Sequence, residues 1–103
     1  MKTLTEILTG RVLSDVNTLE VRNAKELAAK AAAEIANAKK FWSVWNADDH
    51  AVRVFTFTRR ARDMQAKARE LTAGNLNAAA DYSAIVMLYV TAIRELTGNH
   101  FAL

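Results

Sequence analysis

Residues 24–45 read AKELAAKAAAEIANAKKFWSVW, and residues 54–71 read VFTFTRRARDMQAKAREL. In both segments apolar residues recur at alternating steps of four and three, which keeps one stripe of a helix apolar over several turns. The first stripe comprises Ala24, Ala28, Ala31, Ile35, Ala38, Trp42 and Trp45, and the second comprises Val54, Phe57, Ala61, Met64, Ala68 and Leu71. The spacing therefore predicts two helices, each with one face suited to packing.

A short polar segment, residues 46–49 (NADD), separates the two stripes. The helices can fold back on each other across it as an antiparallel hairpin whose apolar faces meet. Asp48 and Asp49 lie where a capping residue and a first-turn acid complement the dipole of the second helix. We therefore expect the second helix to begin at these acids.

The segment between the stripes also has a strand-like alternative. Residues 52–58 read VRVFTFT, which is rich in β-branched and aromatic residues and could pair with residues 41–46 as a β-hairpin. Two features favour helix. The heptad steps run without a break from Val54 to Leu71, and the loop lacks the Asn-Gly or Asp-Gly pair of a tight hairpin. A helix end, a turn and a helix start are expected within residues 41–58.

The N-terminal region has two helix-start signals. Thr3 with Glu6 has the form of a capping box and predicts a short first helix that weakens at Gly10. Asn23 with Glu26 forms a second such box, so a kink is expected near Asn23.

The C-terminal region predicts one more helix, which follows a C-cap at Gly74 and runs to about Thr97, where Gly98 ends it. Its apolar positions cover a wide face and predict extensive burial. These positions are Tyr82, Ile85, Val86, Tyr89, Val90, Ala92, Ile93 and Leu96.

The whole composition is that of one folded domain spanning residues 1–103. Of the 103 residues, 51% are hydrophobic and 24% are charged, which is typical of a globular protein. The expected fold is all-α: a small helical bundle built on the long antiparallel hairpin, with a hydrophobic C-terminal helix. No secretory signal is recognised, and the longest apolar run is about half of a bilayer-spanning length, so a cytoplasmic protein without a membrane partner is expected.

Basic residues gather on the second helix of the hairpin and at the end of the first. With a net charge of +3, they could follow a phosphate backbone and give salt-dependent binding. The alternative is a solvated face whose cations pair with acids of the neighbouring helix, with Glu34 near Arg60 and Glu26 near Lys67 and Arg69. The candidate polyanion-binding residues are Lys39, Lys40, Arg53, Arg59, Arg60, Arg62, Lys67 and Arg69.

Aromatic and apolar residues near the hairpin turn and the C-terminus are candidates for partner binding. A bundle this small has limited room to bury them, and large exposed side chains anchor protein interfaces. The alternatives are that the tryptophans belong to the core and that the C-terminal tail folds back onto the bundle. The candidate partner-binding residues are Phe41, Trp42, Trp45, Phe101 and Leu103.

No constellation in the sequence indicates catalysis. His50 lies beside two acids but lacks a second ligand at helical spacing, and the absence of cysteine removes thiolate nucleophiles, thiolate metal ligands and disulfides. We therefore expect no catalytic residue, no metal, no cofactor and no small-molecule substrate. The function expected is that of a non-enzymatic helical interaction module, which binds a protein partner or assembles with itself. Small helical proteins of this kind occur among phage and mobile-element accessory proteins, a fold-level association only. The alternative is nucleic-acid binding through the basic helix face.

Overall fold

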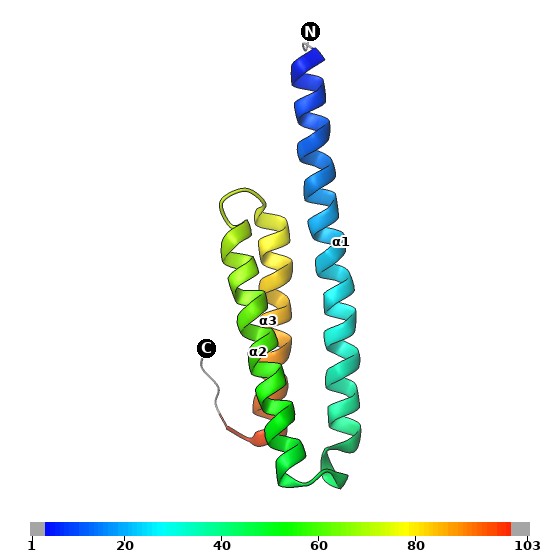
Figure 1. The fold of residues 1–103 in the computed structure, drawn as a ribbon, viewed down its shortest axis with the longest axis vertical. Coiled ribbons are helices and arrows are strands. Elements are labelled where there is room, and N and C mark those ends of the chain that lie inside the picture. Colours follow the sequence, from blue (N-terminus) through cyan, green and yellow to red (C-terminus); the bar gives the residue numbers. More distant parts are fainter. Residues whose placement is uncertain (1–3, 100–103) are drawn as a thin grey trace.

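The chain forms an all-α bundle in the computed structural model, which describes the backbone of residues 4–99 and the side chains of residues 19–99. Helix α1 spans Leu4–Phe41, a short 3-10 turn (η1) spans Trp42–Val44, α2 spans Ala47–Leu71, and α3 spans Leu76–Thr97 (Figure 1). The predicted fold class is confirmed. Because residues 4–99 contain no strand, the β-hairpin alternative is wrong.

The three helices lie side by side, with α2 running opposite to α1 and α3 (Figure 1). Helix α3 packs against both α1 and α2, whereas α1 and α2 make few close contacts with each other. The apolar faces of the hairpin therefore meet α3, whereas the sequence predicted that they would meet each other directly. Helix α1 has 38 residues, against 25 in α2 and 22 in α3, so its N-terminal part extends past the α2–α3 turn (Figure 1). We call this extension, residues 4–19, the α1 overhang.

The N-terminal region differs from the expectation of a short first helix. Helix α1 is continuous through Gly10 and Asn23, so neither residue marks a helix boundary. One glycine within a helix costs about 1 kcal/mol relative to alanine, which good helix formers on both sides can offset. Thr3, the predicted cap, lies outside the described residues.

The turn between α1 and α2 contains the expected helix end and helix start. Asn46 caps α2: its side-chain oxygen accepts a hydrogen bond from the Asp49 N–H at 2.8 Å, and the Asp49 carboxylate accepts one from the Asn46 N–H at 3.3 Å. This reciprocal pair is a capping box. Asp48 and Asp49 lie in the first turn as expected, but the cap itself is Asn46.

The predicted cap at Gly74 is wrong. Helix α2 ends at Leu71, and its C-cap is Thr72, whose hydroxyl donates to the Ala68 carbonyl at 2.8 Å. Gly74 lies in the following turn, where its N–H donates to the Leu71 carbonyl at 3.1 Å. The Thr72 hydroxyl therefore satisfies one of the free carbonyl groups at the end of α2, two residues before Gly74.

The limits of α3 match the expectation closely. Asn75 caps its start by accepting a hydrogen bond from the Ala78 N–H at 3.1 Å. Gly98 ends it with φ of 73°, a left-handed conformation that favours glycine.

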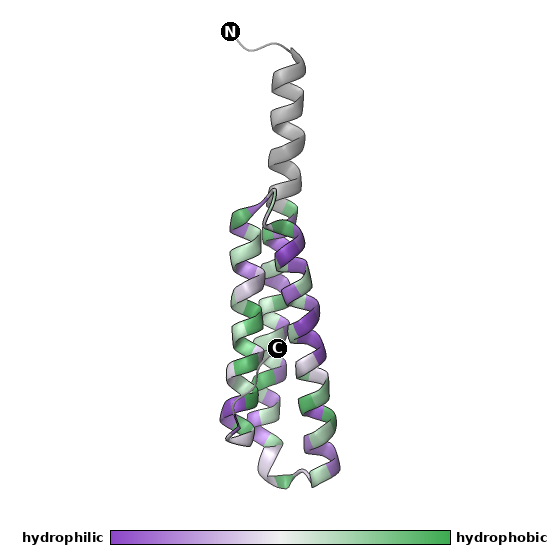
Figure 2. Cartoon of the chain, turned by 90° about the vertical axis from the view of Figure 1, so that its left-hand side faces the viewer, coloured by the Kyte–Doolittle hydropathy of each residue, from purple (hydrophilic) through white to green (hydrophobic). Residues whose placement is uncertain are grey.

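The core combines small residues on α1 with bulkier ones on α2 and α3. Ala24, Ala31 and Ala38 face the bundle and are almost fully buried, whereas the largest fully buried side chains are Phe57 and Ile85. Alanine on one helix lets the neighbouring axes approach, and a bulky residue opposite fills the space. Figure 2 shows hydrophobic residues recurring along the coloured part of each helix. Most of the predicted stripe of α3 is buried, including Tyr82, Ile85, Tyr89, Ala92 and Ile93, whereas Val90 and Leu96 are half-buried.

Helix α3 is also long and apolar enough to cross a membrane, judged by length and composition alone. The same properties are found in the central helix of a bundle, and α3 packs one face against both other helices.

Candidate functional site

A polar cluster joins all three helices near the middle of the bundle. The Glu34 carboxylate accepts a hydrogen bond from the Arg60 guanidinium at 2.9 Å and one from the Tyr89 hydroxyl at 3.4 Å. The predicted proximity of Glu34 and Arg60 is therefore confirmed. The sequence pattern places Tyr89 in the apolar stripe, and its hydroxyl reaches the edge of the core and completes this cluster.

A second cluster of the same kind lies closer to the α2–α3 turn. Glu20 pairs with Lys67 at 3.5 Å and accepts a hydrogen bond from the Tyr82 hydroxyl at 3.5 Å. The predicted partner of Lys67, Glu26, is wrong, because Glu26 is exposed whereas Glu20 lies half-buried against α2. The two tyrosines of these clusters, Tyr82 and Tyr89, are seven residues apart, and so are the two basic residues, Arg60 and Lys67. The heptad spacing of the sequence therefore indicated that a similar cluster could occur twice.

Burial and the neighbouring Glu34 carboxylate raise the pKa of Tyr89 to about 12, and Arg60 opposes this effect. The folded chain then keeps the tyrosine proton between about pH 10 and 12, where the unfolded chain releases it. We therefore expect the free energy of unfolding to fall as the pH rises through this range because of Tyr89. Thermal melts of the wild type and of Tyr89→Phe should show a shallower alkaline decline in the variant. Equal declines would contradict the assignment.

Several of the candidate polyanion-binding residues form ion pairs or lie over aromatic rings. Lys39 pairs with Glu95 at 2.7 Å, and Lys40 lies over the Phe41 ring. The Arg53 guanidinium lies over the rings of Trp45 and Phe57, at 5.2 and 5.8 Å from their centroids. Arg60 and Lys67 are also paired. Among the candidate arginines, the exposed ones that form no ion pair within residues 19–99 are Arg59, Arg62 and Arg69.

This dispersed charge leads us to expect only weak, non-specific binding to nucleic acid at physiological salt. Replacing Arg62 and Arg69 by glutamine should lower the slope of log affinity against log salt by about 1 for each phosphate contact removed. Fluorescence anisotropy with a labelled DNA duplex measures this slope. Tight, sequence-selective binding would contradict the expectation.

The aromatic candidates at the α1–α2 turn are in contact with one another and with α2. The Trp42 ring stacks on His50 at a centroid distance of 3.9 Å, and the His50 Nε2–H donates to the Trp42 carbonyl at 2.7 Å. Trp45 lies against the core and stacks on Phe41 at 6.4 Å. Both tryptophans are half-buried, whereas Phe41 is exposed. Phe101 and Leu103 lie outside the described residues.

Large hydrophobic residues remain exposed at the same end of the bundle. We call them the tip residues: Phe41, Val44, Val52 and Phe55. Phe55 borders a shallow hollow with Trp42, His50 and Leu96. The predicted partner-binding residues at the turn therefore lie beside exposed apolar neighbours that the sequence alone did not single out.

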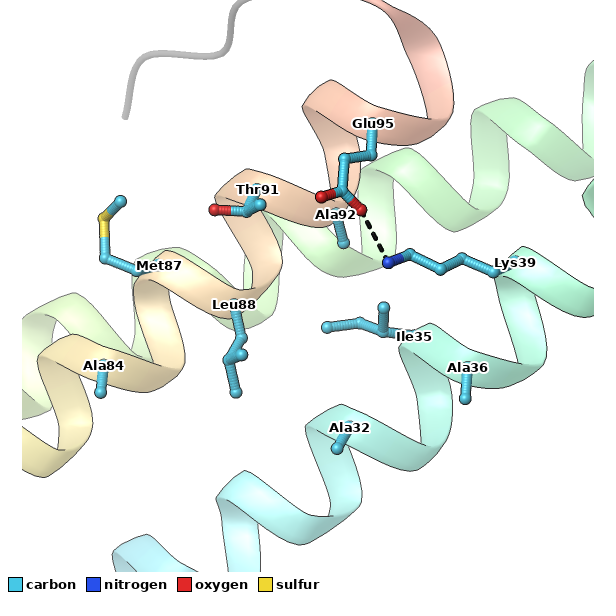
Figure 3. A pocket seen from close by; sticks show the side chains of 10 residues that line it. All are labelled: Ala32, Ile35, Ala36, Lys39, Ala84, Met87, Leu88, Thr91, Ala92 and Glu95. Carbon is cyan, nitrogen blue, oxygen red and sulfur yellow. Dashed lines mark ion pairs between the residues drawn. The ribbon is translucent and has the colours of Figure 1, made fainter.

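A second apolar surface lies on the side of the bundle, between α1 and α3. Ala32, Ile35 and Ala36 of α1 line one wall of this groove, and Ala84, Met87 and Leu88 line the other (Figure 3). The Lys39–Glu95 ion pair lies at one end (Figure 3). We call this feature the α1–α3 groove. Its exposed residues include Met87, at 59% exposure, and Leu88, at 41%.

The apolar surface continues from the groove along the outside of α3. Helical spacing places six residues without charge on one face: Leu76, Ala80, Ala84, Met87, Leu88 and Thr91. Five of them are exposed and Thr91 is half-buried. The sequence predicted wide burial for α3, but the bundle covers only one side of it. The sequence did indicate that the outer side of α3 is also apolar, because Asp81 is the single charged residue between Leu76 and Ile93.

Groups suited to holding a metal ion do not gather in the described part of the chain. Within residues 19–99, no three histidine, aspartate or glutamate side chains converge on a common point. Comparison of the chain with family models, curated proteins and solved structures finds no match.

Proposed function

We propose that the protein is a non-enzymatic interaction module that associates with a protein surface through its α1–α3 groove. The observation that carries this proposal is the exposed, uncharged face of α3, which borders the groove from Ala84 to Thr91 and continues beyond it to Leu76. Soluble helices in small bundles normally place charged residues opposite the core. An apolar face in that position points to a partner that covers it.

The groove has the form used to bind an amphipathic helix. Its walls are two parallel helices, its lining includes Ala32, Ala36, Ala84 and Ala92, and Met87 and Leu88 lie along one side. Large side chains on a docked helix can reach into such a groove at spacings of three and four residues. Met87 adds a flexible side chain that adapts to different neighbours.

We expect charged substitutions in the groove to weaken association strongly while the fold persists. Met87→Glu and Leu88→Glu place carboxylates on the proposed contact, and each should weaken binding at least tenfold because a buried unpaired charge is strongly unfavourable. Sedimentation of the purified chain measures self-association. Affinity capture with the tagged chain, followed by measurement of each purified partner, tests other proteins.

Val52→Glu is the matched control, because Val52 is an exposed tip residue at 64% exposure and lies outside the groove. It should leave association unchanged, and circular dichroism should show equal helical content in all three variants. If Val52→Glu or Phe41→Ser removes binding and the groove variants do not, the tip residues are the interface and the groove assignment is wrong.

A further inference from the structure

The α1 overhang has an apolar face of its own, distinct from the face that α1 buries in the bundle. In the sequence, Leu4, Leu8, Val12, Val16 and Leu19 recur at steps of four, four, four and three, which places them along one side of a helix. At about 100° per residue, the centre of this side lies roughly 120° around the helix from the buried row of Ala24, Ala31 and Ala38. The overhang face is therefore not a continuation of the bundle core.

The described end of the overhang agrees with this placement. Leu19 is 54% exposed, whereas Ala24, little more than one turn later, is 1% exposed. A helix that carries a leucine-rich face beyond its own bundle requires another surface to cover that face.

We infer that this surface is the α1–α3 groove of a second copy of the chain, with the overhang running antiparallel to α1 and α3 of that copy. Two copies would exchange overhangs about a two-fold axis, and each groove would hold a fourth helix. This inference rests on the proposed use of the groove and adds the identity of its occupant.

The lengths of the two surfaces match. The overhang from Leu4 to Leu19 and the uncharged face of α3 from Leu76 to Thr91 both extend about 22 Å, at about 1.5 Å per residue. In the antiparallel arrangement, Leu19 of the incoming helix enters at the Leu76 end. Leu4 then lies toward the end of the groove where Lys39 pairs with Glu95.

The sizes of the side chains are also complementary. The outward side of α1 along the groove carries the exposed residues Ala29, Ala32, Ala33 and Ala36. Leucine and valine from an incoming helix fit against alanine because large and small residues then alternate across the contact. A match in length and in shape, both supplied by the same chain, favours a second copy over an unrelated partner.

The inference is tested first by the mass of the full chain in solution. We expect sedimentation velocity to show a concentration-dependent dimer for the wild type. Leu8→Glu in the overhang and Met87→Glu in the groove should each raise the dissociation constant at least tenfold. Val12→Glu and Leu88→Glu serve as second variants should either of the first pair lose helical content. Asn17→Glu, which changes the opposite side of the overhang, and Val52→Glu at the tip should leave the dimer intact.

Mixing the two variants gives a test specific to exchange. In a mixed dimer of Leu8→Glu with Met87→Glu, the wild-type overhang of one chain meets the wild-type groove of the other. Dimer should therefore reappear on mixing, with an affinity between those of the wild type and the separate variants. A dimer sensitive to only one of the two substitutions, or no recovery on mixing, would overturn the inference in favour of overhang–overhang or groove–groove pairing.

Cross-linking reports the direction of the incoming helix. Because the chain has no cysteine, Leu8→Cys can be mixed with either Leu88→Cys or Leu76→Cys. The antiparallel arrangement brings position 8 level with position 88, so a disulfide-linked dimer should form in the first mixture and not in the second. The reverse result overturns the stated direction.

A wild type that remains monomeric overturns this inference but not the proposed function. In that case the groove variants must still lose a foreign partner that Val52→Glu retains. The proposed function itself fails only if substitutions in the groove leave every association unchanged.

Discussion

Replacing Phe57 by alanine should lower the free energy of unfolding by about 3–5 kcal/mol, the range typical of large-to-small changes at buried aromatic positions. Phe57 has 0% exposure and is one of the two largest side chains that the bundle buries completely. Its ring centroid lies 5.3 Å from that of Tyr89 on α3, and the Arg53 guanidinium lies over the ring at 5.8 Å from its centroid. Removing the ring would leave a cavity between α2 and α3. Chemical denaturation followed by circular dichroism measures the loss.

Phe55→Ala is the matched control for this substitution. Phe55 lies on the same helix and undergoes the same chemical change, but it is 66% exposed. Exposed substitutions away from special features typically change stability by less than about 0.5 kcal/mol. Equal losses for the two variants would contradict the placement of Phe57 at the centre of the bundle.

The difference between Phe55 and Phe57 illustrates what apolar spacing can predict. The alternating steps of four and three include Phe57 and exclude Phe55, and the structure buries the first and exposes the second. The same spacing predicted the buried alanines of α1 and the stripe of α3. Periodicity succeeds here because each helix has only one side against the core.

The interruptions of the helices were harder to predict than their faces. Gly10 and Gly74 both indicated helix ends, but α1 continues through the first, and Thr72 caps α2 before the second. A breaker residue sets only a local preference. The net free energy of the neighbouring turns and the available capping hydroxyls decide where the helix ends.

The polar contacts of the candidate regions could be predicted only in part. The hairpin register brought Glu34 to Arg60, because antiparallel helices place opposite charges at predictable levels. The link from Glu34 to Tyr89 depends on how α3 packs against the pair, which the hairpin alone does not determine. The α1–α3 groove depends on the same packing. Its alanines lie in a helix-forming segment and reveal no surface until α3 is placed beside them.

Replacing Ala31 or Ala61 by leucine should destabilise the bundle by about 1–3 kcal/mol, because extra methylene groups in a packed core force neighbouring side chains and backbone to shift. Both residues have 0% exposure, and they lie on different helices that contribute to the same buried cluster. Ala66→Leu is the control on α2, since Ala66 is exposed and leucine is a good helix former. Thermal melts should show lower midpoints for the two core variants and an unchanged midpoint for the control. If either core variant is as stable as the wild type, the space at that position is larger than its burial implies. A fall for Ala66→Leu as large as the others would mean that helix content, rather than packing between helices, sets the effect.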